Sequence, residues 1–245
     1  MIRVAVAGAR GRMGAEVVRA VTGAHDMEVV AQIEVDDSLE TALRNSGATV
    51  LVDFTVPEST FGNILTSLDC GVVPLVGTTG LSAEQLDTIR QRCHDQRTPC
   101  LIAPNFALGA VLMMRFAAEA ARYMPDVEII EYHHERKVDA PSGTALKTAD
   151  MIAATRTATP APPPENAFEI LPGSRGGSAP GPIPVHSVRL PGFVASQEVL
   201  FGAPGQRLSI RHDSIDRTSF MPGVLLAIRK ARELNGLVVG LEHLL

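Results

Sequence analysis

Short apolar runs alternate with segments of helical periodicity from the N-terminus to Asn105. The run "TVLVDFT" at residues 49–55 is almost continuous in apolar side chains, which is typical of a strand buried on both faces. The same patterns predict strands at residues 2–7, 29–33, 72–79 and 100–105, and helices at 15–21, 38–43, 58–69 and from Ser82, which has Gln85 as its capping-box partner. Repeated strand–helix units predict a parallel, doubly wound α/β sheet.

The pattern changes after Asn105. A long apolar helix at 108–124, a strand at 127–132 and a helix from 142 to 157 are expected, followed by two proline- and glycine-rich segments, 157–167 and 172–184, that predict loops without helix or strand. Strands at 185–190, 194–201 and 208–212 are joined by short turns and are expected to be antiparallel. A helix at 218–234, capped by Asp216, and a final strand at 237–241 end the chain. These segments indicate a second domain of α+β type.

Three glycines separate the first expected strand from the first expected helix in "VAVAGARGRMG". Gly8, Gly11 and Gly14 permit a tight turn and let backbone N–H groups approach a pyrophosphate at the helix N-terminus. The GxxGxxG spacing is less specific than the commoner GxGxxG, but Glu34 lies 20 residues after Gly14, where a carboxylate accepts hydrogen bonds from a ribose. The segment predicts a dinucleotide site, with a purely structural turn as the alternative.

The residues near Glu34 bear on which nicotinamide cofactor binds. Glu34 would repel a ribose 2′-phosphate and Val35 offers no cation to receive one, which favours NADH. Arg10 and Arg12 could reach such a phosphate, so NADPH stays open; exposed solubilising arginines are the alternative reading. The turns "DFT" (53–55), "GTTG" (77–80) and "APNF" (103–106) follow later strands, and a cofactor at the carboxyl edge of the sheet would lie across them.

Titratable side chains crowd the segment "EYHHERKVDAPSGTA" at residues 131–145. Histidine exchanges protons near neutral pH, and Lys137 supplies a cation or an acid. The Pro-Ser-Gly-Thr that follows opens a helix, whose N-terminal amides suit a carboxylate. We therefore expect an acidic substrate. A metal site is a weaker reading, because adjacent histidines on an extended segment point to opposite faces and no HExxH spacing occurs.

Composition narrows the classes of partner. A hydrophobic fraction of 45% can fill a core, and a net charge of −5 without any lysine or arginine run gives no footprint for nucleic acid or an anionic membrane. Cys70, Cys93 and Cys100 show no CxxC spacing, so neither a disulfide framework nor a zinc site is expected. Without a signal peptide or a long apolar run, a cytoplasmic location is the expectation.

These motifs together resemble the dihydrodipicolinate reductase family of diaminopimelate and lysine biosynthesis. The resemblance covers the whole chain through "GARGRMG", "DFT", "GTTG" and "APNF", and above all through residues 131–145, which match the family signature E-x-H-H-x-x-K-x-D-A-P-S-G-T-A at every fixed position. It implies a Rossmann-like domain of residues 1–104 and 216–245 around an inserted domain of residues 105–215, which has a mixed or antiparallel sheet and forms a homotetramer. Many relatives carry arginine directly after the ribose-binding acid, where this chain has Val35.

The resemblance also implies roles for single residues. His133 would donate or accept a proton, Lys137 would donate one, and His134, Gly143 and Thr144 would hold a cyclic dicarboxylate substrate. NADH or NADPH would contact the glycine loop, Glu34 and the later turns: Gly8, Ala9, Arg10, Gly11, Arg12, Met13, Glu34, Gly77, Thr78, Thr79, Ala103, Pro104, Asn105 and Phe106. The reaction implied is hydride transfer to 4-hydroxy-tetrahydrodipicolinate with loss of water. Another two-domain reductase of a small acidic substrate and a non-catalytic NAD(P)H sensor are the alternatives.

Overall fold

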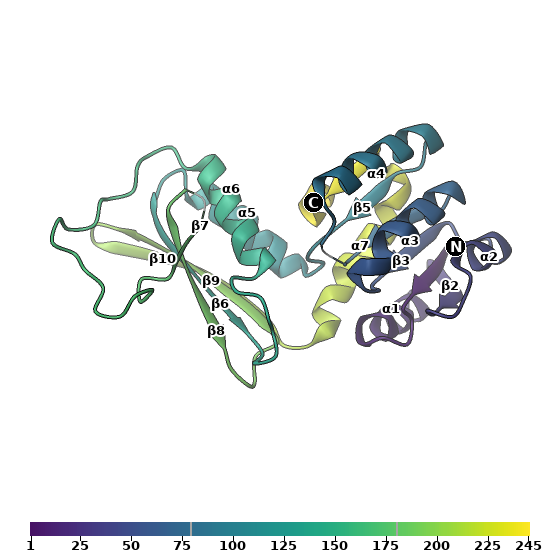
Figure 1. Ribbon diagram of the computed structural model, residues 1–245, viewed down its shortest axis with the longest axis horizontal. Helices are drawn as coiled ribbons and strands as arrows, with labels where there is room; N and C mark the ends of the chain where they lie inside the picture. Colours follow the sequence, from purple (N-terminus) through teal and green to yellow (C-terminus); the bar gives the residue numbers. More distant parts are fainter. Residues whose placement is uncertain (79, 180) are drawn as a thin grey trace. The chain divides into compact units, whose positions relative to one another are not determined.

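Two separate β-sheets organise the chain, each within its own unit (Figure 1). The computed structural model describes residues 1–245 except Thr79 and Pro180. Unit 1 comprises Met1–Leu108 together with Arg217–Leu245, and unit 2 comprises Gly109–Asp216.

Unit 1 is built on a sheet whose strands in the described residues are all parallel, in the order β11-β5-β4-β3-β1-β2. The strands are β1 (Ile2–Ala7), β2 (Met27–Ile33), β3 (Val50–Asp53), β4 (Val73–Val76), β5 (Cys100–Ile102) and β11 (Leu237–Val239). The predicted parallel sheet of α/β type is confirmed. The C-terminal strand β11 extends it beside β5, which returns the end of the chain to the first sheet.

Two of the helices of unit 1, α2 (Leu39–Ser46) and α4 (Ala83–Gln96), begin at serine side-chain caps. The unit also contains α1 (Arg12–Thr22), α3 (Pro57–Asp69) and α7 (Met221–Lys230). The Ser82 hydroxyl accepts a hydrogen bond from the Gln85 amide at 3.2 Å, and the Gln85 side chain accepts one from the Ser82 amide at 2.9 Å, so the predicted capping box is confirmed. The Ser38 hydroxyl likewise accepts from the Thr41 amide and caps α2.

The last helix differs from its prediction. Regular α-helix begins only at Met221, after a 3₁₀ turn at Arg217–Phe220, and it ends at Lys230 before a second 3₁₀ turn at Ala231–Glu233. Pro222 has no N–H and is accommodated only in the first helical turn, so the α-helix cannot extend back to 218. Asp216, the expected cap, directly precedes this 3₁₀ turn, and the N-cap residue of the α-helix itself is Phe220.

Buried aliphatic side chains lie on both faces of the unit 1 sheet. On one face, Leu51 packs with Leu43 of α2, and Val76 belongs to a cluster with side chains from α3 and α4. Val52 and Leu75 alternate with these residues, so they face the other side, and both are fully buried. All of β3, Val50–Asp53, is buried, as its continuous apolar run predicts. This two-sided burial fixes the strands, and with them the turns that follow each strand at the carboxyl edge.

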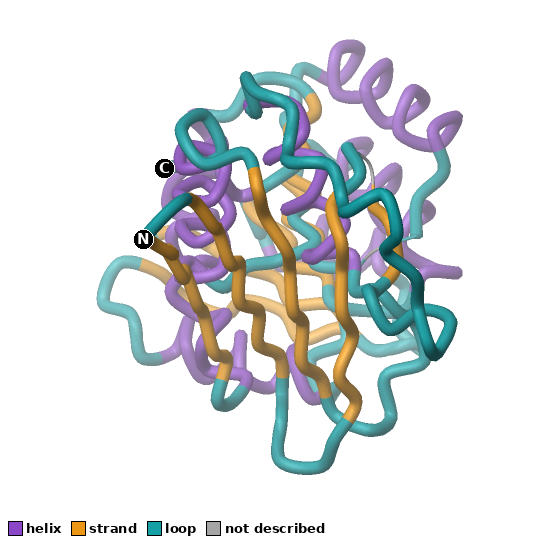
Figure 2. The backbone as a smooth tube through the Cα atoms, turned by 90° about the vertical axis from the view of Figure 1, so that its left-hand side faces the viewer, coloured by secondary structure: helices purple, strands orange, loops and turns teal. Residues whose placement is uncertain are grey.

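Unit 2 is built on a mixed sheet in the order β10-β9-β6-β8-β7 (Figure 2). Its strands are β6 (Asp126–His133), β7 (Gly177–Ala179), β8 (Ile183–Arg189), β9 (Ala195–Ala203) and β10 (Gln206–Ser214). The expected antiparallel pairing is confirmed for β9 and β10, but β8 does not pair with β9: β6 lies between them and pairs with β8 in parallel. The chain between β6 and β8 contains a helix, and such a crossover returns the chain in the same direction.

Another correction concerns the glycine-rich segment at 172–184, where no strand was expected. Gly177–Ala179 forms β7 and pairs antiparallel with the start of β8. This strand consists of Gly, Ser and Ala, so it has no alternation of apolar and polar residues that would predict a strand. Its pairing depends on backbone hydrogen bonds at the edge of the sheet.

One face of the unit 2 sheet is packed against helices. In Figure 1, α5 (Leu108–Ala120) and α6 (Gly143–Thr155) lie on the same side of the sheet, and the Thr155 hydroxyl donates to the Ala118 carbonyl at 2.7 Å. Along β6, Ile129 and Glu131 are buried, whereas Glu128, Ile130 and Tyr132 are only half-buried. Because alternate residues of a strand face opposite ways, the first pair faces the core and the others face outward. None of the helices in the described part of the chain combines the length and hydrophobicity needed to cross a membrane.

Candidate active site

The glycine loop of unit 1 joins β1 to α1 in a tight turn. Gly8 has a φ of +70°, a conformation that favours glycine, and its N–H donates to the Ile33 carbonyl at 2.8 Å. A Cβ on Gly14 would lie 2.0 Å from the Gly8 carbonyl oxygen, so only glycine allows the first turn of α1 to approach the loop so closely. Gly11 is the N-cap residue of α1 and places no side chain over the helix N-terminus. This end of α1 can therefore receive a phosphate group on backbone amides.

Glu34 follows β2 directly and is joined to the glycine loop. Its carboxylate accepts a hydrogen bond from the Arg10 backbone amide at 2.7 Å. The carboxylate therefore lies beside the phosphate-binding turn, as a ribose-binding acid requires. Arg10, Arg12 and Val35 have exposed side chains, with Val35 94% exposed.

The later turns lie at the same carboxyl edge of the sheet. The Thr78 hydroxyl donates to the Thr55 carbonyl at 2.9 Å, and Gly77 packs so closely on Phe54 that a Cβ there would lie 2.0 Å from the ring. Phe54 in turn packs against Phe106, with ring centroids 5.6 Å apart. The turns after β3, β4 and β5 thus form one packed assembly.

The predicted cofactor residues differ in what they offer to a ligand. Ala103 and Phe106 are buried, so their side chains belong to the core and only their backbone groups can line a site. The Asn105 side-chain oxygen accepts from the Ala107 amide at 2.8 Å and shapes that turn. Thr79 lies outside the described residues. The structure brings the other predicted cofactor residues to one edge of the unit 1 sheet.

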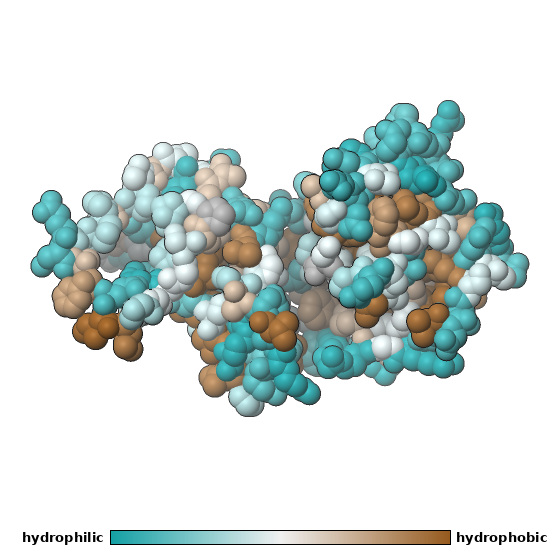
Figure 3. Space-filling view, viewed as in Figure 1, coloured by the Kyte–Doolittle hydropathy of each residue, from teal (hydrophilic) through white to brown (hydrophobic). Residues whose placement is uncertain are grey.

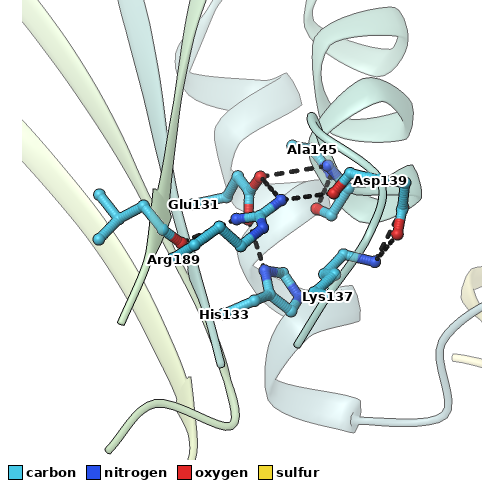
Figure 4. A network of polar contacts seen from close by, with 8 residues as sticks. Glu131, His133, Lys137, Asp139, Ala145 and Arg189 are labelled. Atoms are coloured by element: carbon cyan, nitrogen blue, oxygen red, sulfur yellow. Dashed lines mark hydrogen bonds and ion pairs between the residues drawn. The ribbon is translucent and has the colours of Figure 1, made fainter. Parts of the chain in front are cut away.

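The histidine–lysine segment of unit 2 surrounds a buried carboxylate (Figure 4). Glu131, on β6, is fully buried, and its Oε2 lies 2.5 Å from Nδ1 of His133 at the end of the same strand. Arg189, at the end of β8, donates to both Glu131 oxygens, at 2.9 and 2.7 Å. Burial opposes ionisation of Glu131, but hydrogen bonds from His133, Arg189 and Ser187 outweigh it and lower the pKa to about 2.

Lys137 lies in the loop between β6 and α6. Its ammonium group donates to both Asp139 oxygens, at 2.7 and 2.8 Å, and the Lys137 side chain as a whole is 21% exposed. The hydrogen bond from Lys137 lowers the pKa of Asp139. Lys137 thus lies shortly after His133, the last residue of β6, and His134, and its side chain is accessible to an anion from solvent.

The start of α6 follows this loop directly. Ser142 caps the helix by accepting from the Ala145 amide at 3.2 Å, which leaves Gly143 and Thr144 in the first turn. Gly143 is exposed, and a Cβ there would meet no atom within 4 Å. His134 is half-buried, and its Nδ1 has no hydrogen-bond partner among the described residues. The predicted substrate residues His133, His134, Lys137, Gly143 and Thr144 thus lie along one segment, from the end of β6 to the first turn of α6.

Two residues of this cluster, Glu131 and Arg189, were not among the site residues predicted from the sequence. Glu131 precedes His133 by two positions, and that spacing puts both on one face of a strand, so it was a detectable signal. Arg189 is 58 residues from Glu131, and only the parallel register that pairs His133 with Arg189 brings it there. No pattern of neighbouring residues in the sequence predicts that β6 and β8 pair in this register.

A parallel α/β unit with a glycine turn at a helix N-terminus, and a second unit with a histidine–lysine cluster, define a two-domain nicotinamide-dependent oxidoreductase. Sequence comparison identifies which one. The family profile for the dihydrodipicolinate reductase N-terminus matches residues 2–106, and that for the C-terminus matches residues 109–245. The chain belongs to the dihydrodipicolinate reductase family.

Individual relatives agree over their full lengths. The 4-hydroxy-tetrahydrodipicolinate reductases of Desulfitobacterium hafniense and Mycolicibacterium vanbaalenii are 48% and 51% identical, and the aligned regions cover 100% of this chain and 98% and 99% of theirs. A dipicolinate-bound dihydrodipicolinate reductase from Paenisporosarcina sp. TG-14 has the same fold, with a TM-score of 0.89, 43% identity and full coverage of both chains. A probable dehydrogenase from Thermotoga maritima shares the fold alone, at a TM-score of 0.69 and 9% identity over 99% of this chain and 92% of that one.

Proposed function

We propose that this chain reduces 4-hydroxy-tetrahydrodipicolinate to tetrahydrodipicolinate, with oxidation of NAD(P)H and loss of water, in diaminopimelate and lysine biosynthesis. The observation that carries the proposal is the His133–Lys137 segment at the N-terminus of α6, in a chain that matches the reductase family over both units. Relatives named for this activity, and the solved relative that binds dipicolinate, a cyclic dicarboxylate, support the substrate class.

The residues of unit 1 fit a dinucleotide. The close approach of Gly14 to Gly8 keeps the end of α1 open to a pyrophosphate, and Glu34 offers a carboxylate to the ribose hydroxyls beside it. Gly77, Thr78 and the backbone of residues 103–106 would line the nicotinamide end. When bound, the nicotinamide supplies the hydride that the reduction consumes.

Two groups of unit 2 can supply the proton that accompanies hydride addition. Addition to a conjugated imine leaves negative charge on the ring-nitrogen side of the substrate, and His133 or Lys137 would neutralise it by proton transfer. That conjugated imine forms when the 4-hydroxyl leaves as water together with a hydrogen of an adjacent ring carbon; hydride and one proton then add to it.

The carboxylates of the substrate require a separate set of contacts. The first-turn residues Gly143 and Thr144 offer the N-terminus of α6, where the helix dipole favours an anion. His134 would add a side-chain contact. Lys137 holds the Asp139 carboxylate in this structure, which supports the proposal that its ammonium group can bind a substrate carboxylate in the same way.

NADH is the cofactor that the ribose end favours. The half-buried Glu34 carries a negative charge where NADPH would place its 2′-phosphate, and Val35 contributes no compensating cation. The exposed Arg10 and Arg12 side chains supply the route by which NADPH could also be used.

A homotetramer assembled through unit 2 is part of the proposal. The outward face of its sheet holds the half-buried Ile130 and Tyr132, and the loop between α6 and β7 exposes Phe168, Ile170 and Leu171 by 82, 84 and 71%. The hydrophobic patch at the far left of Figure 3 lies over this loop. Exposed apolar surface of this kind marks interfaces. Light scattering should give four times the 26.0 kDa chain mass; a monomer would refute this assembly.

The cytoplasmic location expected from the sequence stays a prediction.

The activity is tested by NADH oxidation, followed by the loss of its absorbance, on substrate formed in place from pyruvate and aspartate semialdehyde by a condensing enzyme. Oxidation that requires the condensing enzyme and is lost in His133→Ala supports the proposal. A folded protein that binds NADH but oxidises none of it would refute the proposal and favour a cofactor sensor.

A further inference from the structure

We propose that Glu131 is a positioning residue that fixes the tautomer and orientation of His133, and that Arg189 clamps the Glu131 carboxylate in place for this purpose. The proposal rests on the proposed function only in giving His133 a proton to transfer. It is carried by the hydrogen bonds around Glu131 and by the burial of the residues that make them.

The Glu131 carboxylate is saturated with donors. Oε1 accepts from Arg189 Nη2 at 2.7 Å and from the Ser142 backbone amide at 3.3 Å. Oε2 accepts from Arg189 Nη1 at 2.9 Å and lies 2.5 Å from His133 Nδ1. The side chain has no exposed surface. A fully enclosed carboxylate with this many donors has one stable orientation, so its direction toward His133 is fixed.

This environment decides which nitrogen of His133 carries hydrogen. With its pKa lowered to about 2, Glu131 is ionised at neutral pH and can only accept hydrogen bonds. The short contact with Nδ1 therefore requires Nδ1 to be the donor. In the neutral ring Nε2 is then the acceptor, and in the charged ring Nε2 carries the transferable proton. Proton exchange with substrate is thus confined to Nε2, and the imidazole remains Nδ1–H after the proton has left.

Arg189 has a structural role, because its terminal nitrogens donate to protein groups, and we do not assign it to substrate binding. Besides Glu131, its Nη1 donates to the Val188 carbonyl at 2.8 Å and its Nη2 donates to the Asp139 carbonyl at 2.7 Å. Its Nε is buried and has no partner among the described residues. The two terminal nitrogens therefore use all four hydrogens on protein groups. The bond to the Asp139 carbonyl also fastens the Lys137 loop to the strand that holds His133.

The tautomer is measured directly in the wild-type protein without substrate or cofactor. Long-range ¹⁵N–¹H correlation spectra of histidine-labelled protein distinguish Nδ1–H from Nε2–H, and the spectrum of His133→Gln assigns the signals of His133. We expect the neutral ring to be Nδ1–H. A wild-type ring that is Nε2–H would overturn the proposal, whether or not any variant folds.

Variants of Glu131 test the consequence for turnover. Glu131→Gln keeps the size of the side chain but can offer its amide hydrogens to Nδ1, so we expect a shift toward Nε2–H and a fall in kcat of at least about 10²-fold, with NADH affinity within about twofold of wild type. Glu131→Asp keeps an ionised acceptor, so the Nδ1–H form should persist and kcat should exceed that of Glu131→Gln by about tenfold. An unchanged tautomer or near-wild-type kcat in Glu131→Gln would contradict the assignment.

Glu128 provides a matched control on the same strand. It faces the opposite side of the sheet and also pairs with a histidine and an arginine, accepting from His186 Nε2 at 2.8 Å and from Arg175. Glu128→Gln should leave kcat and the His133 signals unchanged, with light scattering to verify the same assembly. If wild type shows the expected tautomer but reduces no substrate, the proposed function fails and the positioning of His133 stands.

Discussion

Gly14 is a position at which the structure requires glycine. In Gly14→Ala, the new Cβ would lie 2.0 Å from the Gly8 carbonyl oxygen and 2.8 Å from the Ala9 Cα, whereas real Cβ atoms essentially never come within 3.0 Å of such neighbours. The glycine loop must therefore retreat by about 1 Å. The bonds at risk are those from the Gly8 amide to Ile33 and from the Arg10 amide to Glu34.

The expected change in stability combines two opposing effects. A lost hydrogen bond costs about 1 kcal/mol, or about 2 kcal/mol when a charged acceptor such as Glu34 is involved. Alanine in place of glycine in a helix stabilises it by about 0.5–1 kcal/mol. With both bonds lost, we therefore expect Gly14→Ala to lower the free energy of unfolding by about 2–2.5 kcal/mol and to raise the NADH dissociation constant at least about tenfold, or ~1.4 kcal/mol.

Gly62→Ala is the matched control, because Gly62 lies inside α3, is exposed and has no atom within 4 Å of the position of a new Cβ. That variant should gain about 0.5–1 kcal/mol and leave NADH binding unchanged. Urea unfolding followed by circular dichroism and NADH titration by fluorescence measure both quantities. If Gly14→Ala matches Gly62→Ala in stability and affinity, the tight approach of α1 to the loop is not what forms the cofactor site.

Three further predictions concern single side chains. Val35→Arg should raise the NADPH/NADH ratio of kcat/KM by about tenfold, since it adds a cation beside Glu34; an unchanged ratio would mean that the arginines of the glycine loop already set cofactor preference. Lys137→Ala should lower kcat by about 10²-fold while NADH affinity stays the same, and equal losses in both would contradict its role on the substrate side. The pKa of Glu131 is lowered from 4.5 to about 2, so this group contributes stability above the higher value and loses it as the pH falls toward the lower one, because the unfolded chain binds a proton that the folded chain does not. In urea unfolding the stability gap between wild type and Glu131→Gln should therefore narrow by up to about 3 kcal/mol between about pH 5 and pH 2, and a gap independent of pH would refute the ionised state.

The accuracy of the sequence-based predictions followed the range of the interactions involved. The parallel strands of unit 1 were predictable because a strand buried on both faces needs a continuous apolar run, as in Val50–Asp53. The capping box at Ser82 was predictable because its two hydrogen bonds span only three residues. By contrast, β7 was missed and β8 was expected beside β9 although it lies between β6 and β7, since both errors concern which strands are neighbours in the sheet.

By itself the sequence determined where most helices and strands form, where the chain needs glycine, and which titratable side chains stand together between β6 and α6. Those properties depend on side-chain periodicity and on bonds between near neighbours. Only the tertiary structure decided that Arg189 reaches Glu131, and hence that His133 faces an ionised carboxylate with its Nδ1. The reason is physical: the parallel register of β6 and β8 pairs residues 56 positions apart, and the burial of such pairs as Ile129 and Val185, not any local preference, selects that register.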